Sequence, residues 1–274
     1  MCAHASAHCE HAKHNDTSTR NITIQAREYM KILQHIGEYV LLMGKVFHLP
    51  DRQRMFWRQY SFELEKQGLM SLPIVVIISV FIGAILTVQT KLNTENPLLP
   101  VYTTGLLTRD TLLLEFSSTI LCLILAGKVG SNIASEIGSM RITEQIDAME
   151  IMGVNSANYL ILPKIVAFMT IMPLLVIISI AVGLVGGYLV GVTSDIITVA
   201  DYLVGIQYAF IPYYVAYAII KSVVFAFIIT SLSSYYGYFV KGGALDVGRA
   251  STNAVVNSNI IILMTDLLLT NLLL

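Results

Sequence analysis

The chain has 274 residues, of which 55% are hydrophobic and only 13% are charged, and its mean hydropathy is +0.69. Because a soluble domain carries about 25% charged residues, this composition excludes an ordinary soluble protein and predicts an all-α membrane protein with several spanning helices. The formal net charge of -1 gives no sign of a nucleic-acid partner, so the placement of Lys and Arg is more informative than their sum.

Residues 1–28 form a polar segment ahead of the first patterned sequence. We expect a disordered tail, because the segment has few residues that could build a core. Its His and Cys residues allow metal binding as an alternative, although their spacing fits no closed zinc site. These residues are Cys2, His4, His8, Cys9, His11 and His14. A further possibility is that translation begins at Met30.

Residues 29–274 are predicted to form one membrane domain that starts with an interfacial helix over residues 29–49. Apolar residues recur there on one helical face with polar residues opposite, a pattern typical of a helix lying on a membrane surface. The apolar set is Ile32, Ile36, Val40, Met43 and Phe47. The next segment, Arg52 to Gln67, is basic and aromatic, which indicates the cytoplasmic boundary of the first span.

Five apolar runs are long enough to cross a hydrocarbon core of about 30 Å. The predicted spans cover about residues 72–91, 111–130, 163–191, 211–232 and 255–274. Small residues on one stripe let helices approach closely, and two such stripes are present. They are Gly127, Ser131, Ala134 and Gly138 after the second span, and Gly183, Gly187 and Gly191 in the third.

The distribution of basic residues predicts the orientation. Nine of the 17 Lys and Arg residues precede the first span, and only Lys91 and Arg109 fall on the opposite side. By the positive-inside rule the N-terminus and the segment between spans two and three are cytoplasmic, and the C-terminus is outside.

The longest polar stretch between two apolar runs is Gly127 to Pro163. Within it, Met140 to Gly153 has apolar residues at helical spacing, which predicts a short amphipathic helix that begins at Thr143 and ends at Gly153. Its charged residues suit docking to a partner better than holding a catalytic metal with Glu136. The predicted docking residues are Arg141, Glu144, Asp147, Glu150 and Gly153.

Two ionisable residues lie inside the last two spans. Counting about 1.5 Å per residue places Lys221 and Asp266 at the same depth, which predicts an ion pair between them. The pair is either structural or directly involved in a transport cycle.

Other side chains of the spans could line an apolar path for a substrate, although packing in the core is the alternative for each of them. Gln89 is either part of this path or an interfacial side chain. The candidate residues are Ile85, Val88, Gln89, Leu263 and Leu267.

Motifs of soluble catalysis are absent from the sequence. There is no GxxxxGK[ST] phosphate loop, HExxH, paired CxxC or GxSxG motif. We therefore predict no catalytic residue, no resident metal and no cofactor bound by this chain, and any ATP is expected to bind to a separate chain.

Three segments closely resemble the MlaE-type (YrbE-type) permeases of ABC transporters associated with MCE proteins. They are AGKVGSNIASEIGSMRITEQIDAMEIMG (Ala126 to Gly153), YLILPKIVA (Tyr159 to Ala167) and GGALDVGRASTNAVVNS (Gly242 to Ser258). The resemblance extends from about Met30 to Leu274. DAMEIMG also looks like the loop through which ABC importer permeases dock into their ATPase.

The resemblance implies a homodimeric permease in a bacterial inner membrane, with its N-terminus cytoplasmic and its C-terminus periplasmic. It implies soluble ATPase subunits that bind ATP and Mg²⁺, a periplasmic MCE-domain partner, and phospholipid as the cargo moved between inner and outer membrane. On this basis Met140 to Gly153 is the coupling helix. A permease for another hydrophobic cargo or a metal, or a membrane-embedded enzyme, is the alternative.

Overall fold

The computed structural model describes residues 33–47, 53–94, 100–194 and 197–274. The chain divides into two compact units, Met1–Phe47 and His48–Leu274. In the first unit residues 33–46 are helical, with Ile36 and Val40 exposed. The predicted tail at 1–28 and both ends of the predicted interfacial helix lie outside the described residues.

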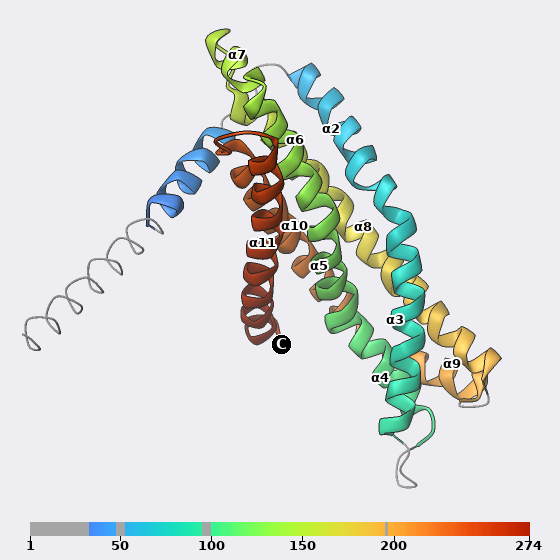
Figure 1. The fold of residues 1–274 in the computed structure, drawn as a ribbon. Helices are drawn as coiled ribbons and strands as arrows, with labels where there is room; N and C mark the ends of the chain where they lie inside the picture. The colour runs from blue at the N-terminus through green and yellow to red at the C-terminus, as the bar shows by residue number, and fades with distance from the viewer. Residues whose placement is uncertain (1–32, 48–52, 95–99, 195–196) are drawn as a thin grey trace, which may run out of the picture. The chain divides into compact units, whose positions relative to one another are not determined.

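In the described part of the second unit, five helices are long and apolar enough to cross a membrane, by length and composition (Figure 1). All regular elements of the described residues are helices, which confirms the predicted all-α membrane fold. The five helices are Arg54–Asn93, Thr103–Ile142, Ser156–Thr193, Tyr213–Tyr238 and Ala244–Leu273. Most extend well beyond the predicted spans, because polar residues at their ends pack on neighbouring helices and so stay helical.

The first two long helices are built from several consecutive segments. The first contains α2 (Gln53–Gln67), a 3₁₀ turn (Leu69–Ser71) and α3 (Leu72–Asn93). The second runs through α4 (Thr103–Thr111), a π-helix (Leu112–Ile120), α5 (Leu121–Leu125), a second π-helix (Ala126–Gly130) and α6 (Ser131–Ile142). Residues 103–110, which lie between the first two predicted spans, are helical, and α4 packs there against α9 and α3.

The predicted helix Met140 to Gly153 is divided in two, so that prediction is wrong in detail. α6 continues to Ile142, Thr143 forms its C-cap, and α7 (Gln145–Ile151) begins only after Glu144, which has a left-handed φ of 59°. Thr143 Oγ1 donates to the Ser139 carbonyl at 2.8 Å, so it bonds back to α6 instead of capping α7. Gly153, with a φ of +76°, follows α7 and ends it as predicted.

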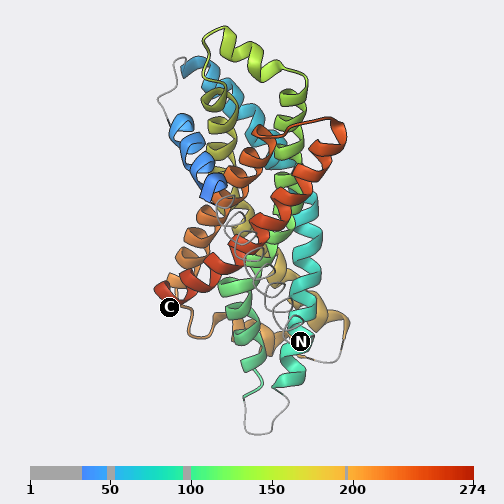
Figure 2. The same cartoon turned by 60° about the vertical axis from the view of Figure 1, so that its left-hand side comes forward.

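The remaining elements are α8 (Ser156–Thr193), α9 (Val199–Gln207), α10 (Tyr213–Tyr238) and α11 (Ala244–Leu273). α8 packs along α3, α10 and α2, and α10 also packs against α6 and α11. The side-by-side course of α10 and α11 can be followed in Figures 1 and 2. α11 starts well before the predicted residue 255, because the Asp246 carboxylate accepts from the Gly243 N–H and caps the helix there.

Backbone contact between α3 and α8 depends on glycine. A Cβ atom at Gly83 would lie 1.8 Å from the carbonyl oxygen of Gly183, and one at Gly186 would lie 2.2 Å from that of Val80. Neither position has room for a side chain, so the two helices meet through their main chains. Part of the predicted glycine stripe in the third span thus packs inside this chain.

Candidate functional site

The candidate site is α7 with the helices that hold it. α7 lies outside all five candidate spans and joins α6 to α8 at one end of the unit (Figure 1). Ile146 is fully buried and anchors the helix, whereas Ile151 and Met152 at its end are 88% and 71% exposed. A polar helix with an apolar tip outside the spans is suited to contact a partner.

Two of the predicted docking carboxylates bond within the chain. Arg141 Nη1 of α6 lies 2.5 Å from Asp147 Oδ1. Glu150 Oε1 accepts hydrogen bonds from Ser156 Oγ of α8 at 2.9 Å and from the Tyr238 hydroxyl of α10 at 2.8 Å. α7 is therefore bonded to three long helices. Sequence spacing alone could not show this, because Tyr238 is remote in the chain.

The other two predicted docking residues lie at the two ends of α7. Glu144 is exposed in the turn before the helix. Gly153 follows the helix and lines a pocket. Among the described residues, no three or more His, Cys, Asp or Glu side chains are grouped as metal ligands. What the structure shows for Asp147 and Glu150 of α7 is hydrogen bonding within the chain.

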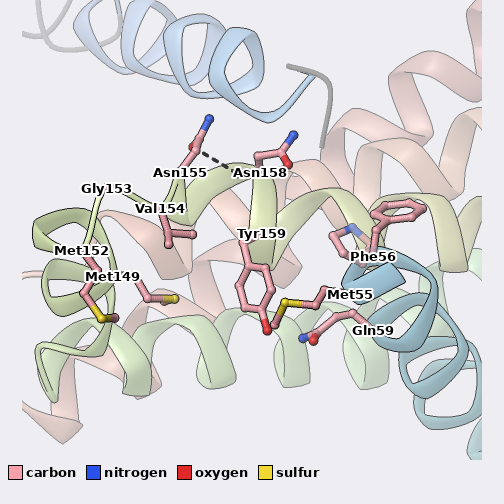
Figure 3. Close-up of a pocket in the computed structure, with 11 residues that line it drawn as sticks. Met55, Phe56, Gln59, Met149, Met152, Gly153, Val154, Asn155, Asn158 and Tyr159 are labelled. Atoms are coloured by element: carbon pink, nitrogen blue, oxygen red, sulfur yellow. Dashed lines mark hydrogen bonds between the residues drawn. The ribbon is translucent and has the colours of Figure 1, made fainter. Parts of the chain in front are cut away.

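The pocket beside α7 has a volume of about 560 Å³ and lies between α2, α7 and the start of α8. Figure 3 shows Met149 from α7, Met152 just after it, Met55 and Gln59 from α2, and Tyr159 from α8 around the same space. Among the described residues, none of those that line it is charged. The pocket thus suits an uncharged, largely apolar group.

A network of four charges ties α2, α6 and α8 together. Lys164 of α8 contacts the Glu63 carboxylate of α2, and its Nζ lies 2.8 Å from Glu136 Oε2 of α6. Lys66 reaches the same Glu136 oxygen at 2.9 Å. Glu63 and Lys164 are each 1% exposed. Because α6 and α8 flank α7, the network joins both sides of α7 to the first long helix.

This network was not predicted from the sequence. The sequence does indicate a polar contact on α2, because Glu63, Lys66 and Gln67 are three and four residues apart and therefore lie on one face of the helix. Gln67 Nε2 donates to Glu63 Oε2 at 2.7 Å, which orients the carboxylate toward Lys164.

A second charge cluster lies within the spanning helices. The predicted contact between Lys221 and Asp266 is present, with Nζ 2.5 Å from Oδ1, and Lys221 is fully buried. Lys221 Nζ also lies 3.1 Å from Glu115 Oε2, a residue that the sequence analysis did not select. The sequence does mark this residue, because Glu115 is the one acidic or basic residue of the run LLLEFSSTILCLILA.

Hydroxyl groups complete this cluster. Thr119 donates to Asp266 Oδ1 at 3.1 Å, and Lys221 donates to the Tyr217 hydroxyl at 3.1 Å. Thr119 and Glu115 belong to the second long helix, where the π-helical segment ends at Ile120. A π-helical segment displaces side chains relative to a regular α-helix and is frequent at functional sites.

The predicted path residues are on two helices, α3 and α11. Ile85, Leu263 and Leu267 are 61%, 53% and 73% exposed, so they are not in the core of this chain. Gln89 is exposed and Val88 is half-buried. These side chains are available to lipid or to another subunit, and their role in a path stays a prediction.

The comparisons with known proteins agree on one family. A family model described as Permease MlaE matches residues 61–272. A probable ABC transporter permease protein of Rickettsia bellii (strain RML369-C) is 36% identical over 248 residues, which cover 89% of this chain and 93% of that protein. The intermembrane phospholipid transport system permease protein MlaE of Haemophilus influenzae is 31% identical, with 90% and 93% covered. The chloroplastic protein TRIGALACTOSYLDIACYLGLYCEROL 1 of Arabidopsis thaliana is 29% identical, with 84% and 66% covered.

Proposed function

The chain belongs to the MlaE permease family, and from this premise we propose that it moves phospholipid between the inner and outer membranes of a bacterium. It is an integral membrane protein and the permease subunit of an ABC transporter, so it is a transport subunit and not an enzyme. The name of the Haemophilus influenzae relative, which specifies intermembrane phospholipid transport, supports the cargo. The exposed apolar faces of α3 and α11 are compatible with acyl chains.

The proposed assembly is a homodimer in the inner membrane with a soluble ATPase on the cytoplasmic side and an MCE-domain protein on the periplasmic side. ATP and Mg²⁺ would bind to the ATPase, since this sequence has no phosphate-binding loop. The N-terminus would be cytoplasmic and the C-terminus periplasmic, as the charge distribution predicts.

The observation that carries the proposal is the bonding of α7. When the ATPase closes on ATP, it would displace α7, and the Asp147 and Glu150 bonds would pass this displacement to α6, α8 and α10. These helices continue into the membrane, so their movement would reshape a lipid cavity. α7 is thus the proposed coupling helix.

Charge reversal at Glu144 tests the ATPase contact. Glu144 is exposed, so Glu144→Lys leaves the internal bonds of α7 intact, and it is expected to reduce ATPase co-purification about tenfold. Glu65→Lys makes the same charge change on the exposed face of α2 and should leave co-purification unchanged. If no chain with a phosphate loop accompanies the unaltered protein, the proposed function is wrong.

Reconstitution tests the cargo. The permease and its ATPase, placed in vesicles with a fluorescent phospholipid, are expected to show ATP-dependent transfer of that lipid to an MCE-domain acceptor. Transfer of a different hydrophobic molecule at a higher rate, with no transfer of phospholipid, would favour the alternative cargo.

A further inference from the structure

The segment 144–155, which contains α7, is acidic except at the end of the helix, where Ile151 and Met152 form an apolar tip. Residues 144–155 contain three carboxylates and no Lys or Arg, yet Ile151 and Met152 are among the most exposed large apolar residues that the structure describes. An exposed apolar tip of this kind marks an interaction surface. The carboxylates disfavour an anionic membrane surface as the partner, because like charges repel. A protein surface is the better match.

The pocket described above opens beside this tip and shares residues with it. Met152 is 71% exposed and also lines the pocket, as does Val154, which is 41% exposed. The turn at Gly153 brings both side chains to the same edge (Figure 3). A partner that covers the tip of α7 therefore also covers the mouth of the pocket.

The lining determines which chemical group fits. Met55, Met149 and Met152 provide flexible, polarizable side chains that adapt to different shapes. Gln59 and Asn158 supply amide groups, and the described lining residues include no ionised group that could compensate a buried charge. A volume of about 560 Å³ accommodates a large apolar side chain.

We infer that the pocket between α2, α7 and α8 is the second half of the ATPase contact, and that it receives an uncharged, apolar side chain of the ATPase. This inference rests on the proposed function, because it assumes the ATPase that α7 is proposed to dock. The ATPase would then hold α2 as well as α7. Closure of the ATPase would then act directly on the first long helix, through the pocket on α2, as well as through α7. The Lys164–Glu63 ion pair would pass this movement from α2 to α8.

Photocrosslinking tests the occupant directly. Benzoylphenylalanine placed at Met55 in the full-length protein, expressed in cells of its source organism, is expected to give an adduct with a chain that mass spectrometry identifies by a GxxxxGK[ST] motif. Trp57 is 62% exposed on the same helix but does not line the pocket, and the same probe there should give no such adduct. Adducts from Met55 only to residues 33–47 of this chain, or only to lipid, would overturn the inference.

A filling variant separates this inference from the proposed function. Met55→Trp occupies the pocket, and we expect it to weaken ATPase co-purification about tenfold, as expected for a residue at the centre of an interface. Ser61→Trp adds the same side chain at an exposed position of α2 that does not line the pocket and should have no effect. Thermal unfolding of both variants checks that the fold is kept.

The outcomes of the variants are distinguishable. If Ile151→Asp removes the ATPase while Met55→Trp retains it fully, the pocket is not part of the contact, although α7 remains the coupling helix. If the unaltered protein binds no ATPase, both the inference and the proposed function fail.

Discussion

At the scale of single residues, Lys221 has the most consequential environment. Its ammonium group faces two carboxylates, Glu115 and Asp266, and its side chain is fully buried. Removing one partner of a buried ion pair leaves an uncompensated charge, which costs more than the pair contributes. The three residues are therefore not equivalent: loss of either carboxylate leaves Lys221 with a partner, whereas loss of Lys221 leaves two carboxylates together.

We predict that Lys221→Met lowers the free energy of unfolding by about 3–5 kcal/mol, the range for a broken buried pair. Asp266→Asn should lower the free energy of unfolding by a smaller amount, because Glu115 remains beside the ammonium group of Lys221. Chemical or thermal unfolding in detergent micelles measures both. Arg249→Met, which removes an exposed pair at 3.4 Å, is the control and should change stability by about 0.5 kcal/mol or less. Equal losses for Lys221→Met and Arg249→Met would refute the prediction.

At the scale of helices, α3 and α8 approach each other so closely that a side chain at their contact has no space. Among the described glycines, a Cβ atom would meet its nearest neighbour at the shortest distance here, at Gly83. The position of Gly83 against Gly183 allows the two main chains to touch. In a membrane, such contacts replace the hydrophobic driving force that water supplies to soluble helices.

We predict that Gly83→Ala separates α3 from α8 and lowers the melting temperature of the detergent-solubilised protein. The added Cβ would meet a main-chain carbonyl at 1.8 Å, and a main chain cannot rotate away as a side chain can. Gly127→Ala is the matched control, since nothing lies within 4 Å of that position and alanine favours a helix by about 1 kcal/mol. A melting temperature of Gly83→Ala equal to that of Gly127→Ala would contradict the prediction.

The sequence predicted the long helices better than their ends. Apolar runs of sufficient length identify spans. The residues 103–110 and 244–254 are too polar to continue such a run, and their helices pack against α9 and α6, which the sequence does not show. The split at Glu144 was equally hidden, since a left-handed φ at a non-glycine residue has no pattern in the sequence. The pairing of Lys221 with Asp266 was predictable from depth, whereas Tyr238 with Glu150 was not, because neither residue is exceptional alone.

At the scale of the whole molecule, the orientation in the membrane stays a prediction. If all five candidate spans of the described residues cross the membrane, the two ends of this set of spans lie on opposite sides. From the basic residues before the first span we predict that its start faces the cytoplasm and that the C-terminus faces the periplasm. A reporter active only in the periplasm, fused after Leu274, is expected to be active, while the same reporter in the 144–155 segment is expected to be inactive. The reverse activities would refute the assignment and the proposed ATPase contact.

The length of the first three long helices gives them a mechanical property. At about 1.5 Å per residue, a helix of 38 to 40 residues is about 60 Å long, roughly twice the hydrocarbon thickness. A helix of this length can act as a lever arm: a tilt of about 5° moves a point about 40 Å from the pivot by about 3.5 Å. We predict that the pivot is the contact of Gly183 in α8 with Gly83. It lies 27 residues, or about 40 Å, from Ser156 at the α7 end of α8, so a small rotation there would shift that end.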